Sequence, residues 1–423
     1  MPNNQLIAAQ EPGSSSGSIK ISVVSSVGLI PVVNASVTIT FTGDPDSPLL
    51  ELTTDSSGQT PTVELPAPPV ELSLEPENEI QPYSEYNIEV NAEGYDSVLV
   101  SGSEILADQL SLQSIRMNPL EGGPDEEQVV IIPAHTLFGD YPPKIPEDEI
   151  KPIADTGEIV LSRVVIPEYI IVHDGVPNDS TAPNYWVKYR DYIKNVASCE
   201  IYSTWPEASI YANVLAIMSF TLNRVYTEWY RNQGYNFTIT SSTAYDQKWI
   251  YGRNIFENID YLVDTIFANY LSRPGVSQPI FTSYCDGQRV TCEGLSQWGS
   301  KYLGDQGYSP IEIIRYYYGN DMYINTASAI SGVPSSYPGY DLNIGSSGDK
   351  VRQLQTQLNR IARSYPAIPT VTADGIYGPA TAEAIRIFQG IFNLPQTGVT
   401  DYATWYEVSE IYVGVSRIAE PGS

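Results

Sequence analysis

Two helical patterns within residues 189–230 constrain the fold more than any other part of this 423-residue chain. The first predicts a short amphipathic helix, from aromatic and apolar residues at helical spacing: Tyr189, Tyr192, Ile193 and Val196. The second pattern runs from Ile210 to Val225 and has almost no polar face, which predicts a buried helix. We therefore expect this stretch to be the centre of a folded core.

The start of the second helix carries strong local signals. Thr204 is the expected N-cap, and Pro206 lies in the first turn, where its missing N–H group costs nothing. Glu207 then completes a Thr-x-x-Glu capping box. The helix is therefore predicted to begin directly after Thr204.

One carboxylate, Glu200, stands at the turn between the two predicted helices. Its neighbours Tyr192, Tyr202 and Trp205 are expected to reduce its hydration and to raise its pKa, as a general acid requires. The alternative is a solvated carboxylate in a loop. These residues alone leave both interpretations open.

The negative charge of the chain is concentrated at one end. Residues 1–150 hold 24 Asp and Glu against three Lys and Arg, within a net charge of −28. This acidic excess disfavours nucleic acid as a partner. We expect no membrane span, because no window approaches about 18 uninterrupted apolar residues. We also expect no secretory signal, because the start has no basic region followed by an apolar run.

Alternating apolar and polar residues predict an all-β domain over residues 18–118, after a flexible N-terminus of residues 1–17. Turns separate the alternating runs by about ten residues or more, which fits a small antiparallel sandwich. The order of these pieces resembles the carboxypeptidase-regulatory or transthyretin-like accessory domains. Residues 119–166 are rich in Pro and acidic residues and are predicted to be a linker that a protease could cut. A second linker, rich in small residues, is expected over residues 324–340.

Residues 341–415 have the pattern of three short helices. The first contains a stripe of apolar residues after a Ser-Gly-Asp start, and the second begins near Pro379. The segments LNIGSSGDKVRQLQTQLN and DGIYGPATAEAIRIFQ closely resemble the peptidoglycan-binding domain of the three-helix type. The resemblance implies that this module tethers the chain to peptidoglycan.

Three cysteines, Cys199, Cys285 and Cys292, fall in a middle domain expected over residues 167–323. Asp286 and the glycine after it predict a β-hairpin, which places Cys285 beside the turn and Cys292 several pairs away. Their Cα atoms would then lie beyond the roughly 7 Å that a disulfide tolerates, so reduced thiols are expected. Zinc is disfavoured because the only nearby additional ligand is His173. No metal or other cofactor is expected.

Two blocks of the middle domain resemble the SpoIID/LytB family, which contains peptidoglycan lytic transglycosylases of sporulation. The blocks are VASCEIYSTWPEASIYANVLAIMSFTLNRVY and EGLSQWGSKYLGDQGYSPIEIIRYYYG. The resemblance implies that Glu200 is the catalytic acid. It also implies a set of substrate-binding side chains, which are Tyr202, Tyr245, Asp246, Gln247, Ser296, Gln297 and Trp298. The expected fold is a multidomain α+β chain with an N-terminal all-β sandwich, a central, mostly helical domain with a β-hairpin, and a C-terminal three-helix module.

The order of the domains resembles that of clostridial spore cortex-lytic enzymes. This resemblance implies spore cortex peptidoglycan as the substrate and synthesis in the mother cell, with a final location in the spore. It also suggests a zymogen that a subtilisin-like germination protease cuts within residues 119–166. Two alternatives remain open. The chain could be a non-catalytic peptidoglycan-binding or activator protein, or a hydrolytic muramidase that uses Asp246, Asp286 or Glu293 as a second carboxylate.

Overall fold

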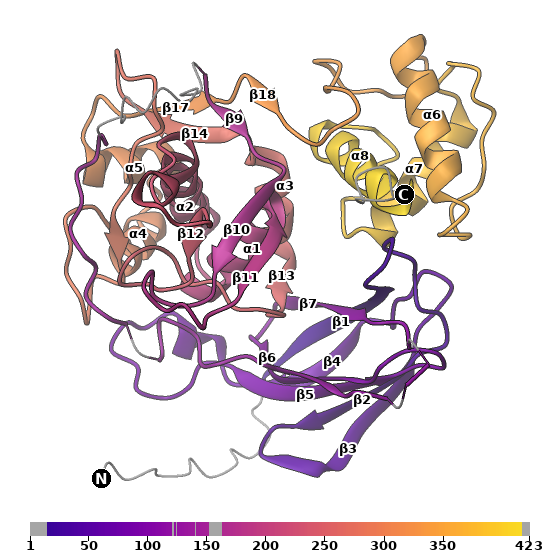
Figure 1. Ribbon diagram of the computed structural model, residues 1–423, viewed down its shortest axis with the longest axis horizontal. Helices are drawn as coiled ribbons and strands as arrows, with labels where there is room; N and C mark the ends of the chain where they lie inside the picture. Colours follow the sequence, from indigo (N-terminus) through magenta and orange to yellow (C-terminus); the bar gives the residue numbers. More distant parts are fainter. Residues whose placement is uncertain (1–14, 121, 124, 140, 152–162, 417–423) are drawn as a thin grey trace. The chain divides into compact units, whose positions relative to one another are not determined.

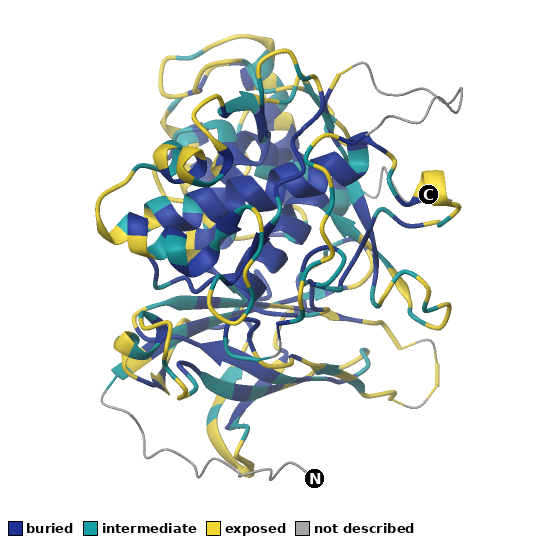
Figure 2. Ribbon diagram, turned by 90° about the vertical axis from the view of Figure 1, so that its left-hand side faces the viewer, coloured by how far each residue is buried: buried dark blue, intermediate teal, exposed yellow. Residues whose placement is uncertain are grey.

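The computed structural model describes residues 15–120, 122–123, 125–139, 141–151 and 163–416 (Figure 1). The described chain is a mixed α+β protein and divides into two compact units. The first contains the chain up to Ala134 together with Tyr251–Glu257, and the second contains His135–Ile250 and the chain from Asn258 onward. In both units, buried residues concentrate on the inner sides of strands and helices, while turns are exposed (Figure 2).

The first unit consists of two β-sheets. One sheet has the order β13-β7-β1-β4, with β1 Ser15–Ser25, β4 Val63–Ala67, β7 Leu110–Met117 and β13 Ile255–Phe256. The other has the order β3-β2-β5-β6-β8, with β2 Ser36–Phe41, β3 Asp44–Thr53, β5 Ser84–Asn91, β6 Val98–Ile105 and β8 Gln128–Ile131. A short 3-10 helix, η1 Val70–Ser73, follows β4. Every second residue of β1 is buried, as the alternating sequence predicts.

The sheets differ from the expected antiparallel arrangement in two places. Strand β1 pairs in parallel with β7, and β6 pairs in parallel with β8. The sequence distance between these partners is long enough for the crossover connections that parallel pairs need. Part of the predicted N-terminal segment, residues 15–17, also belongs to β1, while residues 1–14 lie outside the described residues.

A segment from the middle of the chain completes the first unit. Strand β13 pairs with β7, and the guanidinium of Arg253 forms an ion pair with Glu104 of β6. Neither side chain has any exposed surface. The side-chain amide of Asn254 also donates a hydrogen bond of 2.9 Å to the Glu104 carbonyl oxygen. Residues 251–257 had been assigned to the middle domain by sequence, because a strand of two residues leaves no readable pattern.

The second unit is built around α2 Glu207–Tyr226, which is buried along nearly its whole length. The helices α1 Tyr189–Glu200, α4 Gln297–Asp305 and α5 Pro310–Tyr318 pack against it, and α3 Glu257–Ile266 follows the segment inserted in the first unit. A 3-10 helix, η2 Arg231–Gln233, follows α2. The strands form small sheets: β10 Tyr169–His173 with β11 Asn184–Lys188 and β12 Ile239–Thr240, β14 Asn269–Ser272 with β17 Tyr323–Thr326, β15 Tyr284–Cys285 with β16 Leu295–Ser296, and β9 Val165–Ile166 with β18 Ala329–Ile330.

Two local predictions in this unit are wrong. Helix α2 begins at Glu207 with Pro206 at the N-cap position, and no side chain caps it. The proline can take the extended cap conformation itself, which removes the need for Thr204 as N-cap. The predicted hairpin around Asp286 is absent from the described residues. Instead, β15 and β16 run parallel, because a tight turn after Asp286 redirects the chain.

The C-terminal module contains the three expected helices, α6 Asp349–Ile361, α7 Pro379–Ile391 and α8 Tyr402–Ser416. Gln355 of α6 accepts a hydrogen bond from the Gly375 N–H and donates one to the Ile376 carbonyl oxygen. Gln389 of α7 binds the next loop in the same way, through the Gly398 N–H and the Val399 carbonyl oxygen. Each buried glutamine therefore fixes the loop that leads into the following helix.

Both predicted linkers contain ordered structure. The first contributes β8 to the first unit, and its residues from His135 to Lys151 pack within the second unit. The second contributes part of β17 and all of β18. The composition of the first segment was misleading because two of its acidic residues, Glu147 and Glu149, have basic partners elsewhere in the chain. Residues 152–162 of the predicted first linker lie outside the described residues.

We predict that Glu104→Gln destabilises the first unit by about 3–5 kcal/mol, because it leaves the buried guanidinium of Arg253 without a charged partner. Denaturant unfolding of the full chain measures this change. The matched control is Glu89→Gln, which removes an exposed carboxylate of the same domain. Equal stability of the two variants would contradict a structural role for the Glu104–Arg253 pair.

Candidate active site

Glu200 is the last residue of α1, and its side chain is fully buried. The helix therefore extends further than predicted, and the carboxyl group lies at its C-terminal end. Burial raises the pKa of Glu200 above its ordinary value. The partial negative charge at a helix C-terminus also disfavours a carboxylate there. The site thus favours the protonated form that a general acid needs.

Four groups oppose this effect by stabilising the charged form of Glu200. The backbone N–H of Lys248 donates a 2.7 Å hydrogen bond to Oε1, and the amide of Gln297 lies 3.5 Å from Oε2. The ammonium group of Lys144 attracts the carboxylate electrostatically. The hydroxyl group of Tyr284 lies beside the same carboxyl group and also favours its charged form. Burial outweighs these groups, so the pKa remains raised.

Two aromatic residues of the expected site, Tyr202 and Trp298, form one cluster with Trp205. The rings of Tyr202 and Trp298 have centroids 6.2 Å apart, and Trp205 lies 4.8 Å from Trp298. His135 stacks on Tyr202 at 4.4 Å. All of these side chains are buried. Tyr202 and Trp298 therefore lie together, as the resemblance implies, although their contact with a substrate remains a prediction.

Ser296 and Gln297 begin helix α4. The hydroxyl group of Ser296 accepts a 2.9 Å hydrogen bond from the N–H of Gly299 and so caps the helix. Gln297 is buried and extends its amide toward Glu200. The structure thus brings Gln297 to the candidate acid, while Ser296 has a structural role that the sequence did not predict.

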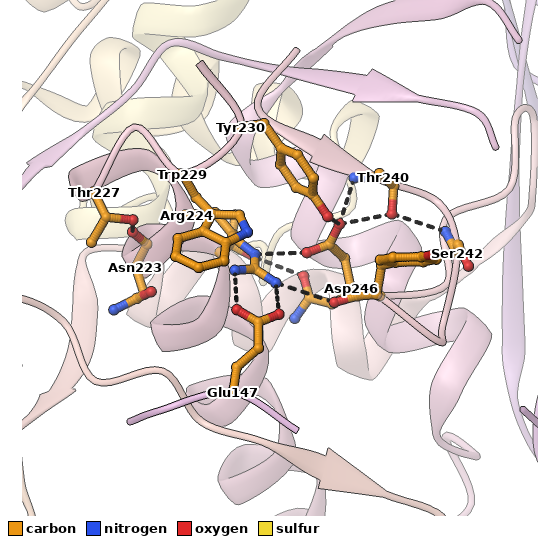
Figure 3. Close-up of polar contacts among 12 residues, drawn as sticks. Glu147, Asn223, Arg224, Thr227, Trp229, Tyr230, Thr240, Ser242 and Asp246 are labelled. Carbon is orange, nitrogen blue, oxygen red and sulfur yellow. Dashed lines mark hydrogen bonds and ion pairs between the residues drawn. The ribbon is translucent and has the colours of Figure 1, made fainter. Parts of the chain in front are cut away.

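Asp246 and Gln247 form buried hydrogen bonds behind the Glu200 carboxyl group. Asp246 accepts bonds from the Arg224 guanidinium, the Tyr230 hydroxyl group and both the N–H and hydroxyl group of Thr240 (Figure 3). The Oε1 atom of Gln247 accepts bonds from two hydroxyl groups, those of Tyr192 and Thr221. The carbonyl oxygen of Tyr245 accepts one from Arg224. These bonds fix the loop that presents the Lys248 N–H to Glu200.

The sequence did not identify one part of the site, residues 135–139 and 141–151, which we call the strap. Tyr141 is buried and its hydroxyl group is close enough to Glu200 and Asp286 to be influenced by their charges. Lys144 is partly exposed, but its ammonium group lies over the buried Tyr284 ring, 4.5 Å from the centroid, and donates a 2.6 Å hydrogen bond to the Asp246 carbonyl oxygen. Burial lowers the pKa of Lys144, and Glu200 opposes this effect.

Ion pairs and backbone contacts hold the strap in place. The Glu147 carboxylate accepts two bonds from the Arg224 guanidinium, at 2.8 and 2.6 Å, and Glu149 forms a similar pair with Arg273. The guanidinium of Arg289 donates to the carbonyl oxygens of Thr136 and Gly139. No local sequence pattern marks the two glutamate pairs, because their arginine partners lie 77 and 124 positions away.

The prediction of reduced cysteines is wrong for two of the three. Cys285 and Cys292 form a disulfide with Cα atoms 6.1 Å apart, while Cys199 is a buried thiol outside any disulfide. The carboxylate of Asp286 accepts hydrogen bonds from the backbone N–H groups of Gln288 and Val290. This tight turn brings the two cysteines together, which an extended hairpin would not do.

Neither histidine is placed as a metal ligand in a recognisable cluster. The nitrogens of His173 contact Asn184 at 2.8 Å and the Val176 carbonyl oxygen at 3.2 Å. No group of three or more His, Cys, Asp or Glu residues with suitable geometry occurs in the described parts of the chain. In the same parts, no helix is both long and apolar enough to cross a membrane.

Two buried polar atoms around Glu200 lack a hydrogen-bond partner among the described residues. They are the hydroxyl group of Tyr141 and the Oε1 atom of Gln297. Buried polar atoms are normally paired, because leaving one unpaired costs about 1–3 kcal/mol. Unpaired atoms concentrated beside one buried acid are typical of a site built to bind something else.

Comparison with known proteins identifies the C-terminal module. Residues 347–407 match the family model described as "Putative peptidoglycan binding domain". No curated protein matches the chain. The chain therefore carries a peptidoglycan-binding domain at this position, as predicted from its sequence.

Three solved structures have local similarity to the chain. The SleB N-terminal domain is 28% identical over 18% of this chain and 99% of its own, with a TM-score of 0.16. The Bacillus anthracis TIE protein is 14% identical over 25% of this chain and 17% of its own, with a TM-score of 0.19. Catechol 1,2-dioxygenase from Acinetobacter is 13% identical over 29% and 60%, also with a TM-score of 0.19. TM-scores this low support no conclusion about the whole fold.

We predict that Glu200→Gln stabilises the full chain more at pH 8 than at pH 5. The raised pKa means that ionisation of Glu200 opposes folding, so stability is lost as the pH rises through the pKa of the folded state. Glutamine cannot ionise and removes this loss. Thermal unfolding at the two pH values measures the difference. Glu207→Gln, at an exposed position of α2, is the control, and an equal response of both variants would contradict a raised Glu200 pKa.

Proposed function

We propose that this protein is a peptidoglycan lytic transglycosylase in which Glu200 is the general acid and base. The observation that carries the proposal is the fully buried carboxyl group of Glu200, with its raised pKa and unpaired polar neighbours. The peptidoglycan-binding domain supplies the substrate class. The resemblance of the two middle-domain blocks to the SpoIID/LytB family supports the reaction type.

In the proposed reaction, protonated Glu200 donates its proton to the glycosidic oxygen while the bond between that oxygen and the anomeric carbon breaks. The resulting carboxylate then removes the proton from the C6 hydroxyl group of the muramic residue. The C6 oxygen attacks the anomeric carbon and forms the 1,6-anhydro ring. Gln297, whose amide lies beside Glu200, is placed to stabilise the charge that develops on the sugar.

The surroundings of the three candidate second carboxylates favour a reaction that needs only one carboxylate. Asp246 is saturated with hydrogen bonds, and Asp286 accepts bonds from the turn that follows it. Glu293 is exposed. A hydrolytic muramidase would need one of them free and close to Glu200. The intramolecular attack of the C6 hydroxyl group avoids this requirement.

The position of the strap supports a zymogen. Tyr141 and Lys144 lie against the Glu200 site, and the acid has no exposed surface. Substrate access therefore requires removal of the strap, and we propose that a subtilisin-like germination protease cuts within residues 119–166. An alternative role for the N-terminal β-domain is to aid folding or coat anchoring.

The biological setting is proposed from the order of the domains. It resembles that of clostridial cortex-lytic enzymes of the SleC type, which suggests spore cortex peptidoglycan as the substrate and the spore as the location. In this scheme the C-terminal domain binds the glycan and raises the local concentration of the catalytic domain. A non-catalytic wall-binding or activator protein remains the second candidate, because the same domain alone would give binding.

The test is digestion of purified cortex peptidoglycan by protease-cut chain, followed by mass spectrometry of the fragments. We expect anhydromuramic ends, and a rate lower by roughly 10²–10⁴-fold for Glu200→Gln because the acid and base are both lost. Glu207→Gln should digest like the unchanged protein. Reducing ends would instead identify a hydrolase. Absence of fragments from every variant would leave only the binding role.

A further inference from the structure

The two terminal nitrogens of the Arg224 guanidinium, which we call the fork, can bind one carboxylate together. Asp246 fixes the guanidinium through its Nε atom. This Nε atom donates a 2.7 Å hydrogen bond to Asp246, and the two terminal nitrogens both bind Glu147 (Figure 3). The Arg224 side chain has no exposed surface and lies among aromatic rings, including those of Phe220, Trp229 and Phe281. Asp246 and the rings therefore hold the guanidinium in place independently of Glu147.

The two carboxylates that bind Arg224 come from different kinds of segment. Asp246 belongs to the loop that presents the Lys248 N–H to Glu200, whereas Glu147 belongs to the strap, which we propose is displaced on activation. Departure of the strap would leave Nη1 of a buried guanidinium without a partner and Nη2 with only the Tyr245 carbonyl oxygen. Because a buried charge with unsatisfied donors is costly, this fork would favour an incoming carboxylate.

Arg224 also lines a cavity of about 200 Å³. Its walls include the rings of Tyr169, Trp229, Tyr230 and Phe237. Its volume is below the roughly 300 Å³ at which typical small-molecule pockets begin, so it suits a group the size of one amino acid. One acidic residue, Glu228, also contributes to the lining, but it is paired with Arg231 at 3.4 Å.

The strap limits the distance between the Arg224 fork and Glu200, because it contacts both. Lys144 lies at the Glu200 site, and Glu147, three residues later, lies on Arg224. An extended chain covers about 10 Å in three residues. A ligand that binds both places therefore carries a carboxylate roughly 10 Å or less from the glycosidic oxygen that Glu200 protonates. Peptidoglycan has such groups, because a short peptide with free carboxylates is attached to its muramic residues.

We propose that Arg224 is a substrate-binding residue that recognises a free carboxylate of the peptidoglycan stem peptide, and that Glu147 occupies this place in the uncut chain. The inference rests on the proposed function for its substrate. It adds a specificity: muramic residues that carry an acidic peptide are bound in preference to those whose peptide carboxylate is blocked.

The first experiment uses protease-cut chain, in which the strap has been displaced, and the ligand N-acetylmuramoyl-L-alanine, with its C-terminal amide as the matched ligand. Without the strap, the fork is vacant while Asp246 still holds Arg224. We expect calorimetry to detect the acid bound to cut chain at least about 10-fold more tightly than the amide, as for a charge-assisted pair. The uncut chain should bind neither. Equal binding of acid and amide to cut chain, or binding of neither, would overturn the proposal.

A second experiment uses protease-cut chain and cortex peptidoglycan whose carboxylates have been converted to amides. We expect KM to rise at least about 10-fold with little change in kcat, because a binding contact is lost rather than the acid. Arg224→Lys, which keeps the charge but loses the fork, should remove this difference between the two substrates. The control is Arg273→Lys, whose side chain also binds the strap but does not line the cavity.

The outcomes separate this proposal from the proposed function. If cut chain digests native and amidated peptidoglycan with the same KM, the role of Arg224 is wrong while the enzyme assignment stands. If cut chain digests neither substrate, the enzyme assignment fails, and the calorimetric comparison of acid and amide still decides whether Arg224 binds carboxylates.

Discussion

The site depends on the hydrogen bonds made to one buried carboxylate, that of Asp246. It connects Arg224 at the end of α2, Tyr230 after that helix and Thr240 of β12. A buried charge of this kind is tolerated only when it is paired and its oxygens are satisfied. The same bonds fix the loop in which Lys248 presents its N–H to Glu200. The hydrogen bonds of Asp246 therefore position both the candidate acid and the Arg224 fork.

Burial of Glu200 suits a general acid, but it makes ionisation of this residue unfavourable for folding. Its carboxyl group lies at a helix C-terminus without exposed surface, an arrangement that raises its pKa and makes its ionisation unfavourable for folding. The strap adds Lys144, a cation that reduces this cost in the uncut chain. In the proposed scheme, removal of the strap takes away that cation as well as the steric block, so that the acid becomes accessible to substrate.

Periodic patterns allowed much of the fold to be predicted, and non-local contacts account for what was missed. The apolar periods of α2 and α6 and the alternation in β1 are visible in sequence because each element buries one recurring set of residues. The pairing of Arg253 with Glu104 joins residues 149 positions apart and has no local signature. The strap was classified as a solvated linker because its composition is acidic and proline-rich, although Glu147 and Glu149 are neutralised by distant arginines. The disulfide was missed because the turn after Asp286 was assigned the wrong geometry.

The measurement that tests the central claim most directly compares the release of soluble fragments from one cortex preparation by uncut and protease-cut chain. If the strap covers a catalytic Glu200, cut chain releases fragments at a rate at least about 100-fold higher. The activity of cut chain should also disappear in Glu200→Gln. Equal rates for uncut and cut chain would contradict the account, because a fully covered acid could not then be the group that acts on the substrate.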